Sequence, residues 1–155
     1  MHYCVLFNNL EGLKLILKKD GDPYLKDKNG DNTFFYSLKY NRIEILFYLF
    51  ENLKNYNIKN KEGENLLQVS ISYSHQKVIE YLVNKTNIDI DNRTVDYGIN
   101  ALQQLTVSNE INNIKLLISK GADLELTNYL GDNLIHLSIM EFNDELTIFY
   151  LEKDE

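Results

Sequence analysis

The sequence has one cysteine, one proline and no tryptophan. A single thiol, Cys4, cannot form an internal disulfide, so the disulfide-stabilised secreted scaffolds are excluded and a reducing compartment is expected. Long apolar runs are also absent, because the longest one, residues 45–50, is far shorter than the roughly 20 residues that cross a bilayer. The first residues carry no basic group before their apolar part, as a secretory signal would require. We therefore expect a cytoplasmic protein without membrane contact.

The sequence has few basic residues: 16 Lys and Arg stand against 23 Asp and Glu, which gives a net charge of −7. The imbalance lies in one half of the chain: residues 1–85 carry 12 basic and 10 acidic side chains, whereas residues 86–155 carry 4 and 13. An acidic half repels phosphates, so nucleic acid is a poor ligand and a basic protein surface is a better one. The 155 residues suffice for one compact unit with a core of its own.

The glycines reveal an internal repeat. Gly30, Gly63, Gly98 and Gly131 are separated by 33, 35 and 33 residues, and each is followed two positions later by asparagine. A period near 33 residues is typical of a stacked array of repeats. The glycine suits a turn with positive φ, and the asparagine suits the N-cap of a helix.

Each unit is predicted to hold two short helices. After the first helix comes a residue suited to left-handed backbone, which we expect at Asn8 or Asn9, Asn41, Ser74 or His75, Asn109 and Asn143. An apolar stripe at helical spacing then marks each second helix and is expected to pack between neighbouring units. The stripes are Leu10, Leu13, Ile16 and Leu17; Ile43, Leu46, Leu49 and Phe50; Val78, Ile79, Leu82 and Val83; and Ile111, Ile114, Leu117 and Ile118.

This unit resembles the ankyrin repeat, whose pattern combines Gly-x-Thr-Pro-Leu-His, two helices and Gly-Ala-Asp. The pattern is visible in residues 121–123 (Gly-Ala-Asp), in residues 131–138 (Gly-Asp-Asn-Leu-Ile-His-Leu-Ser) and in residues 20–30. The resemblance covers nearly the whole chain. It implies an all-α repeat solenoid of about four to five helix-turn-helix units with short β-hairpin or loop fingers. The family's Thr-Pro pair is absent, so the asparagine cap remains while the rigid proline is lost.

The expected boundaries place a single ankyrin-repeat domain over residues 1–155. They divide it into a partial N-terminal repeat (1–27), three repeats (28–60, 61–94 and 95–127) and a truncated C-terminal capping repeat (128–155). The third repeat carries two extra residues, which we expect to form a longer, acidic fingertip at residues 89–93. Terminal repeats must hide one apolar side from water, a role we expect of Tyr3, Phe7 and Lys14 at one end and of Glu145, Phe149 and Tyr150 at the other.

Catalytic patterns are scarce. The three histidines are far apart in sequence and show no metal-ligand spacing, and the glycines never cluster into a phosphate-binding loop. We interpret Cys4 as inert packing in preference to a nucleophile, and His136 as a structural hydrogen-bonding residue, as its family position implies. Residues 27–32 have oxygen-bearing side chains at alternate positions, as a calcium-binding loop has. The twelfth residue of such a loop is acidic, but here it is Leu38, so we do not expect calcium binding. We therefore expect no enzyme activity, no metal and no cofactor.

We therefore expect the function to lie in surface residues, and the ankyrin resemblance implies which side chains are on the surface. Residues beside each glycine form finger tips, and the residues that end each first helix line the concave face. Exposed tyrosines there are typical of protein interfaces, although tyrosine is also abundant, at 11 of 155 residues. The predicted partner-binding residues are Tyr40, Tyr73, Asp96, Tyr97, Ile99, Tyr129, Leu130, Asp132, Met140 and Glu141.

Four functions follow from these observations. The first is a binding module, monomeric when free, that binds and inhibits a basic protein, in the manner of an immunity protein against a toxin or nuclease. The alternative is an intracellular adaptor or host-directed effector that binds a signalling protein or peptide. An enzyme and a purely structural segment of a larger assembly are the two less favoured classes.

Overall fold

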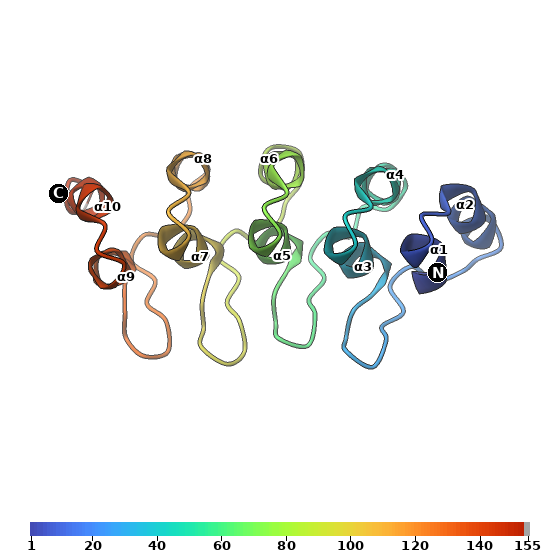
Figure 1. Ribbon diagram of the computed structural model, residues 1–155, viewed down its shortest axis with the longest axis horizontal. Helices are drawn as coiled ribbons and strands as arrows, with labels where there is room; N and C mark the ends of the chain where they lie inside the picture. Colours follow the sequence, from blue (N-terminus) through green and yellow to red (C-terminus); the bar gives the residue numbers. More distant parts are fainter. Residues whose placement is uncertain (154–155) are drawn as a thin grey trace.

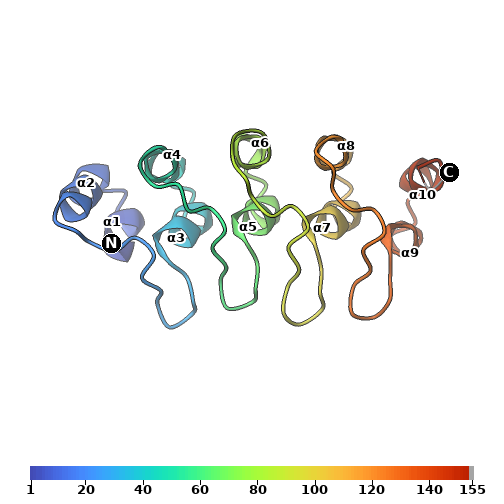
Figure 2. The ribbon, with the colours of Figure 1, turned by 180° about the vertical axis from the view of Figure 1, so that it is seen from behind.

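The computed structural model of the chain describes residues 1–153, which form ten helices in five antiparallel pairs (Figures 1 and 2). The first helices of the pairs lie side by side in one row, and the second helices form a row above them. Loops project below the first row as fingers, and the two termini lie at opposite ends. The helices are α1 (His2–Leu6), α2 (Leu10–Lys18), α3 (Thr33–Lys39), α4 (Ile43–Asn52), α5 (Leu66–Ser72), α6 (Gln76–Lys85), α7 (Ala101–Val107), α8 (Ile111–Ser119), α9 (Leu134–Met140) and α10 (Asp144–Leu151). This arrangement confirms the predicted all-α solenoid.

The glycine and asparagine signature works as predicted. The fingertip glycines Gly30, Gly63, Gly98 and Gly131 all have positive φ, between 66° and 89°. The asparagine side chains cap α3, α5, α7 and α9 by accepting hydrogen bonds from backbone N–H groups of the first turn. Gln68 and Gln103 complete capping boxes on α5 and α7. His136 does the same on α9, since its Nδ1 accepts from the Asn133 N–H at 3.2 Å.

The turns inside the pairs correct one prediction. Left-handed backbone occurs at Asn8, Asn41, Ser74 and Asn109, but in the last pair it falls on Phe142 (φ 53°). The prediction of Asn143 at this place was wrong, because Asn143 is the N-cap of α10 and accepts from the Leu146 N–H. The turn lies eleven residues after the fingertip glycine in each of the last four pairs, so the repeat register overrides the preference of a single residue.

The fingers are loops. Within the described residues, the one ladder element is an isolated antiparallel bridge between Lys59 and Asn65. The predicted acidic fingertip at residues 89–93 was wrong. Asn92 is buried and donates to the Gly63 carbonyl and to the Gln68 side chain, and the backbone bond that closes the third tip begins only at Thr94, so residues 89–93 lie before the tip, at the base of the finger. One extra residue lies in the tip itself, where a backbone hydrogen bond joins Thr94 to Ile99, five residues apart; the matching bond in the preceding finger joins Asn60 to Glu64, four apart.

One hydrophobic core runs through the array and is built largely from the predicted stripes. Leu49, Leu82 and Leu117 hold the same position on successive second helices, and all three are fully buried. Ile16 holds this position on α2 but is 37% exposed, because no helix pair lies in front of it. The stripe prediction was therefore wrong for Ile16.

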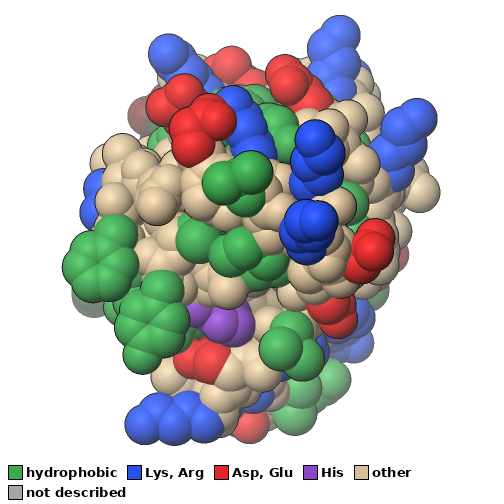
Figure 3. Space-filling view, turned by 90° about the vertical axis from the view of Figure 1, so that its right-hand side faces the viewer, with side chains coloured by type: hydrophobic (Ala, Val, Ile, Leu, Met, Phe, Trp, Pro, Cys, Tyr) green, Lys and Arg blue, Asp and Glu red, His purple; other side chains and the backbone are tan. Residues whose placement is uncertain are grey.

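The ends are less covered than predicted. Tyr3 and Phe7 are 75% and 79% exposed, so they do not shield the N-terminal end, and hydrophobic side chains gather on that end (Figure 3). At the other end Tyr150 is buried as expected, and its hydroxyl lies 2.6 Å from that of Thr106. Glu145 is exposed. None of the helices within residues 1–153 is long and apolar enough to cross a membrane.

Candidate protein-binding surface

Backbone hydrogen bonds tie neighbouring fingers together. The Val95 N–H donates to the Glu62 carbonyl, and the Tyr129 N–H donates to the Tyr97 carbonyl, each at 2.8 Å. The approach is so close that a Cβ at Gly98 would lie 2.6 Å from the Tyr129 ring. Glycine is therefore needed at this tip for its positive φ and for the space it leaves. The tips lie in one row below the first helices (Figure 1).

Tyr129 is held on two sides. Its ring lies against Gly98, and the Arg93 guanidinium lies 4.8 Å from the ring centroid. The same guanidinium donates to the carbonyls of Gly98 and Thr127, which fixes it in place. Tyr129 still leaves 59% of its surface exposed. It therefore connects two fingers and presents an aromatic edge to solvent.

The third and fourth finger tips expose apolar side chains. Val95, Tyr97 and Leu130 are 63%, 60% and 74% exposed. With Tyr129 they form what we call the tip patch. Sequence analysis missed Val95, although its place in the longest finger was a signal. Asp96 is exposed beside the patch, whereas the Asp132 carboxylate accepts a hydrogen bond from Asn128 at 3.0 Å and is half-buried.

Two hollows lie between the fingers and the first helices. The larger, about 330 Å³, is lined by charged residues of the first two fingers and by Phe35, Val69 and Tyr73. The smaller, about 160 Å³, has apolar walls made by Ile99, Val107 and Leu137. Gln104 also lines it and donates from Nε2 to the Ser72 hydroxyl. Within residues 1–153, the buried Gln104 Oε1 has no hydrogen-bond partner.

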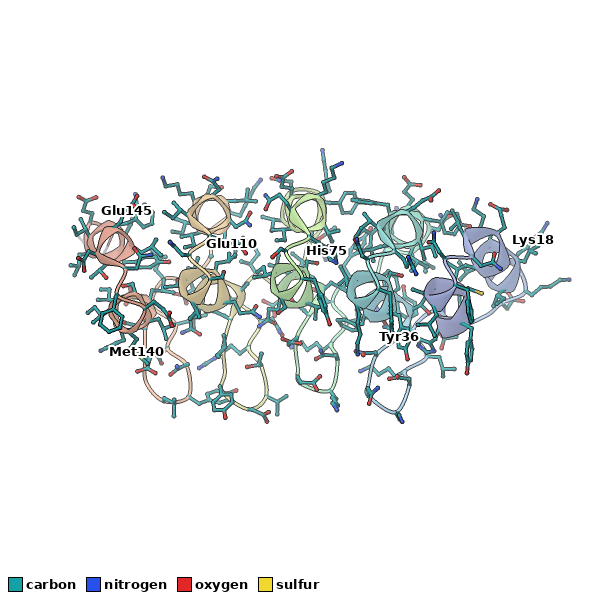
Figure 4. All side chains as sticks on the ribbon, in the orientation of Figure 1. Lys18, Tyr36, His75, Glu110, Met140 and Glu145 are labelled. Atoms are coloured by element: carbon teal, nitrogen blue, oxygen red, sulfur yellow. The ribbon has the colours of Figure 1, made fainter. Side chains whose placement is uncertain are left out.

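The structure divides the ten predicted residues into two groups. Asp96, Tyr97, Ile99, Tyr129, Leu130 and Asp132 belong to the fingers, whereas Tyr40, Tyr73, Met140 and Glu141 lie where first helices end. The second group belongs to a surface that adjoins the two hollows at Tyr73 and Val107, which we call the helix-turn edge. It consists of the five turns between paired helices with their flanking residues, namely residues 6–10, 39–43, 72–76, 107–111 and 140–144. His75 and Glu110 mark it in neighbouring pairs (Figure 4).

Sequence analysis missed the most exposed apolar residue of the helix-turn edge. Phe142 is 93% exposed, and Phe7 at the opposite end of the edge is 79% exposed. Phe7, Tyr40 and Tyr73 hold the same repeat position, 33 residues apart, so an exposed aromatic row was visible in the periodicity. Phe142 gave no such signal, since the equivalent residues Asn41, Ser74 and Asn109 are polar.

The perturbed titratable groups have structural partners. The Tyr36 hydroxyl donates to the Asp27 carboxylate at 2.9 Å. Burial and this bond raise the pKa of Tyr36 to about 12. Burial alone would raise the pKa of Asp27, but N–H groups of Asp31 and Asn29 and the Tyr36 hydroxyl bond its carboxylate and lower that pKa below its usual value. These bonds hold the first finger against α3.

The residues considered for chemistry also have structural roles. His2 and His75 bond the carbonyls of Asp31 and Leu38, and His136 belongs to a capping box. Cys4 packs against the core as a half-buried thiol. Residues 1–153 contain no group of three or more His, Cys, Asp or Glu side chains that could hold a metal ion.

Comparison with protein families agrees with the geometry. A family model of ankyrin repeats in three copies matches residues 1–94 and again residues 36–128. No curated protein matches the chain. Arrays of this kind serve as modules for protein–protein interaction, through the extended surfaces that stacked repeats create. Since the two matches together span residues 1–128, the chain belongs to the ankyrin repeat family.

Proposed function

We propose that this protein is a non-enzymatic module that binds a protein with a basic surface through its finger tips and concave face, and thereby inhibits it. The observation that carries the proposal is the tip patch. Four apolar side chains, each 59% to 74% exposed, lie on two adjacent fingers, whose tips are joined by the hydrogen bond from the Tyr129 N–H to the Tyr97 carbonyl. Exposed aromatic residues grouped in this way supply large, rigid contact area and dominate interface energetics.

The charge of the surroundings indicates the chemistry of the partner. The patch lies in the half of the chain that carries 13 acidic and 4 basic side chains. Asp89, Asp96, Asp123 and Glu125 are all exposed on the fingers or at their bases. Complementary charge accelerates encounter with a basic protein, while the aromatic contacts slow its release.

The smaller hollow fits a basic side chain. Its walls at Ile99, Val107 and Leu137 are apolar, and the buried Gln104 Oε1 lacks a donor within the described residues. A lysine or arginine has an apolar stem and an N–H head, so it can pack against these walls and donate to this oxygen. An inhibitor that occupies functional lysines or arginines of a nuclease or toxin in this way would mask them. The single half-buried thiol is compatible with the reducing cytoplasm that we propose as its location.

The proposal is tested by affinity capture and mass spectrometry from the native organism, with the Tyr97→Ala, Leu130→Ala double variant as a parallel bait. We expect a basic protein that the wild type captures and the variant loses, and we expect added salt to slow its association steeply. Capture of a neutral or acidic signalling protein would instead support an adaptor role. Retention of the same partner by the double variant would refute the placement of the site.

A further inference from the structure

The helix-turn edge has an unexplained residue at one end. Phe142 is 93% exposed and adopts left-handed backbone with φ of 53°. That conformation is unfavourable for a bulky side chain and suits asparagine, which stands at the equivalent positions 41 and 109. In the isolated chain, an exposed aromatic ring on a strained backbone adds no stability. Strain of this kind is typical of sites that contact a ligand or a partner.

Charge changes sign along the same edge. In the second and third turns the basic residues are Lys39, Arg42 and His75. The Lys39 ammonium lies 3.8 Å from the Asp31 carboxylate, and the Arg42 guanidinium donates to the carbonyls of Val5 and Leu6, so within the described residues Arg42 keeps its charge without an acidic partner. In the fourth and fifth turns they are Glu110, Glu141 and Asp144. The first turn, residues 6–10, has none. The edge is therefore basic near its N-terminal half and acidic near its C-terminal half.

Exposed apolar side chains occur on both halves. Phe7, Tyr40 and Tyr73 form the aromatic row of the N-terminal half, with 79%, 40% and 45% exposure. Val107, Met140 and Phe142 occupy the C-terminal half, with 50%, 63% and 93% exposure. An aromatic side chain buries roughly 150–250 Å² when fully covered, so the exposed parts of the four aromatic side chains, with those of Val107 and Met140, offer on the order of 600 Å² per copy. Stable interfaces bury about 800 Å² per partner, and the polar parts of the turns can supply the remainder.

We propose that the helix-turn edge is a self-association surface, on which two copies of this chain pack antiparallel about a two-fold axis at the third helix pair. The basic, aromatic half of each copy then faces the acidic, apolar half of the other. A two-fold interface requires a patch complementary to itself, and an edge whose charge reverses about its middle has that property. Phe142 of each copy lies against the first helix pair of the other, beside Phe7. The tip patch stays free, and the protein is a dimer at high concentration rather than the expected monomer.

Sedimentation velocity of the full chain, from about 1 to 300 μM, tests this surface. At low salt we expect a reversible monomer–dimer equilibrium that weakens as salt is added. The Phe142→Asn variant should raise the dimer Kd at least about tenfold, because it removes the ring while giving the turn its preferred residue. The matched control is Leu130→Asn, which removes a 74% exposed apolar side chain from a finger tip and should leave the Kd within about twofold. A wild type that stays monomeric throughout, or a Phe142→Asn variant with an unchanged Kd, would overturn the proposal.

Charge substitution and cross-linking test the orientation. Glu141→Lys should weaken the dimer, whereas Glu51→Lys, the same charge change away from the edge, should not. Carbodiimide cross-linking of a mixture of isotope-labelled and unlabelled chains should join Lys39 of one copy to Glu110 or Glu141 of another. Intermolecular links from Lys39 to the acidic residues of its own half, such as Glu44, without links to Glu110 or Glu141, would exclude the antiparallel arrangement.

Discussion

At the scale of single residues, Phe142 shows how the register of an array can override local preference. The turn position is fixed at eleven residues beyond the fingertip glycine, and the phenylalanine occupies it despite φ of 53°. Replacing Phe142 with asparagine should raise the free energy of unfolding by about 1 kcal/mol, because left-handed backbone costs bulky residues about that much. Urea unfolding at low micromolar concentration, where the chain is monomeric, measures the change. A loss of stability would mean that the ring makes contacts in the monomer.

Alanine substitutions of Tyr97 and Tyr129 should differ in their effects on binding and on stability. Tyr97 is exposed at a tip, so Tyr97→Ala should weaken binding of the captured partner by about 1–3 kcal/mol and leave the Tm unchanged. Tyr129 packs between Gly98 and Arg93, so Tyr129→Ala should lower the affinity and the Tm together. Titration calorimetry and thermal unfolding separate the two effects, with Tyr129→Phe as the control that keeps the ring. A wild-type affinity in the Tyr97→Ala variant would show that the third finger tip is not part of the binding site.

At the scale of elements, the second helices hold the array together. Leu117 on α8 is fully buried at the position that Leu49 and Leu82 occupy on α4 and α6. Leu117→Ala should therefore lower the free energy of unfolding by about 2–5 kcal/mol, through lost burial and the cavity that remains. Chemical denaturation measures it. Asn112→Ala, an exposed change on the same helix, should stay within about 0.5 kcal/mol, and equal effects of the two would contradict the helix register.

Elements were predictable where their signals are local. Gly98 and Asn100 lie two residues apart and determine the tip and the start of α7 by their own conformations, so the sequence identifies both. The base of the third finger was not predictable in this way. Asn92 is buried because it reaches back to the Gly63 carbonyl and to Gln68, and sequence spacing does not show such contacts. Val95 differs, because its place in the longest finger was visible in the sequence, but the tip of that finger was predicted at residues 89–93 and Val95 was therefore left out.

At the scale of the whole molecule, the two ends differ from the middle. The chain was expected to cover its ends, yet Tyr3, Phe7, Ile139 and Ile148 are all more than half exposed. A linear array explains why these exposures were missed: the pattern of a terminal repeat matches that of an internal one, and only the absence of a neighbour changes the burial. Leu49 and Ile16 hold equivalent positions, but one is fully buried and the other is 37% exposed.

This difference predicts a gradient of local stability. Each inner helix pair is stabilised by two neighbours and each end pair by one, so the ends should open at lower free energy than the middle. In hydrogen exchange with mass spectrometry, amides of α5 to α7 should exchange most slowly, and those of α1, α2 and α10 most rapidly. The measurement is best made on the Phe142→Asn variant at low concentration, because dimerisation would itself protect the turns. Equal protection along the chain would show that the array unfolds as one cooperative unit, and neighbour contacts would then not set the local stability.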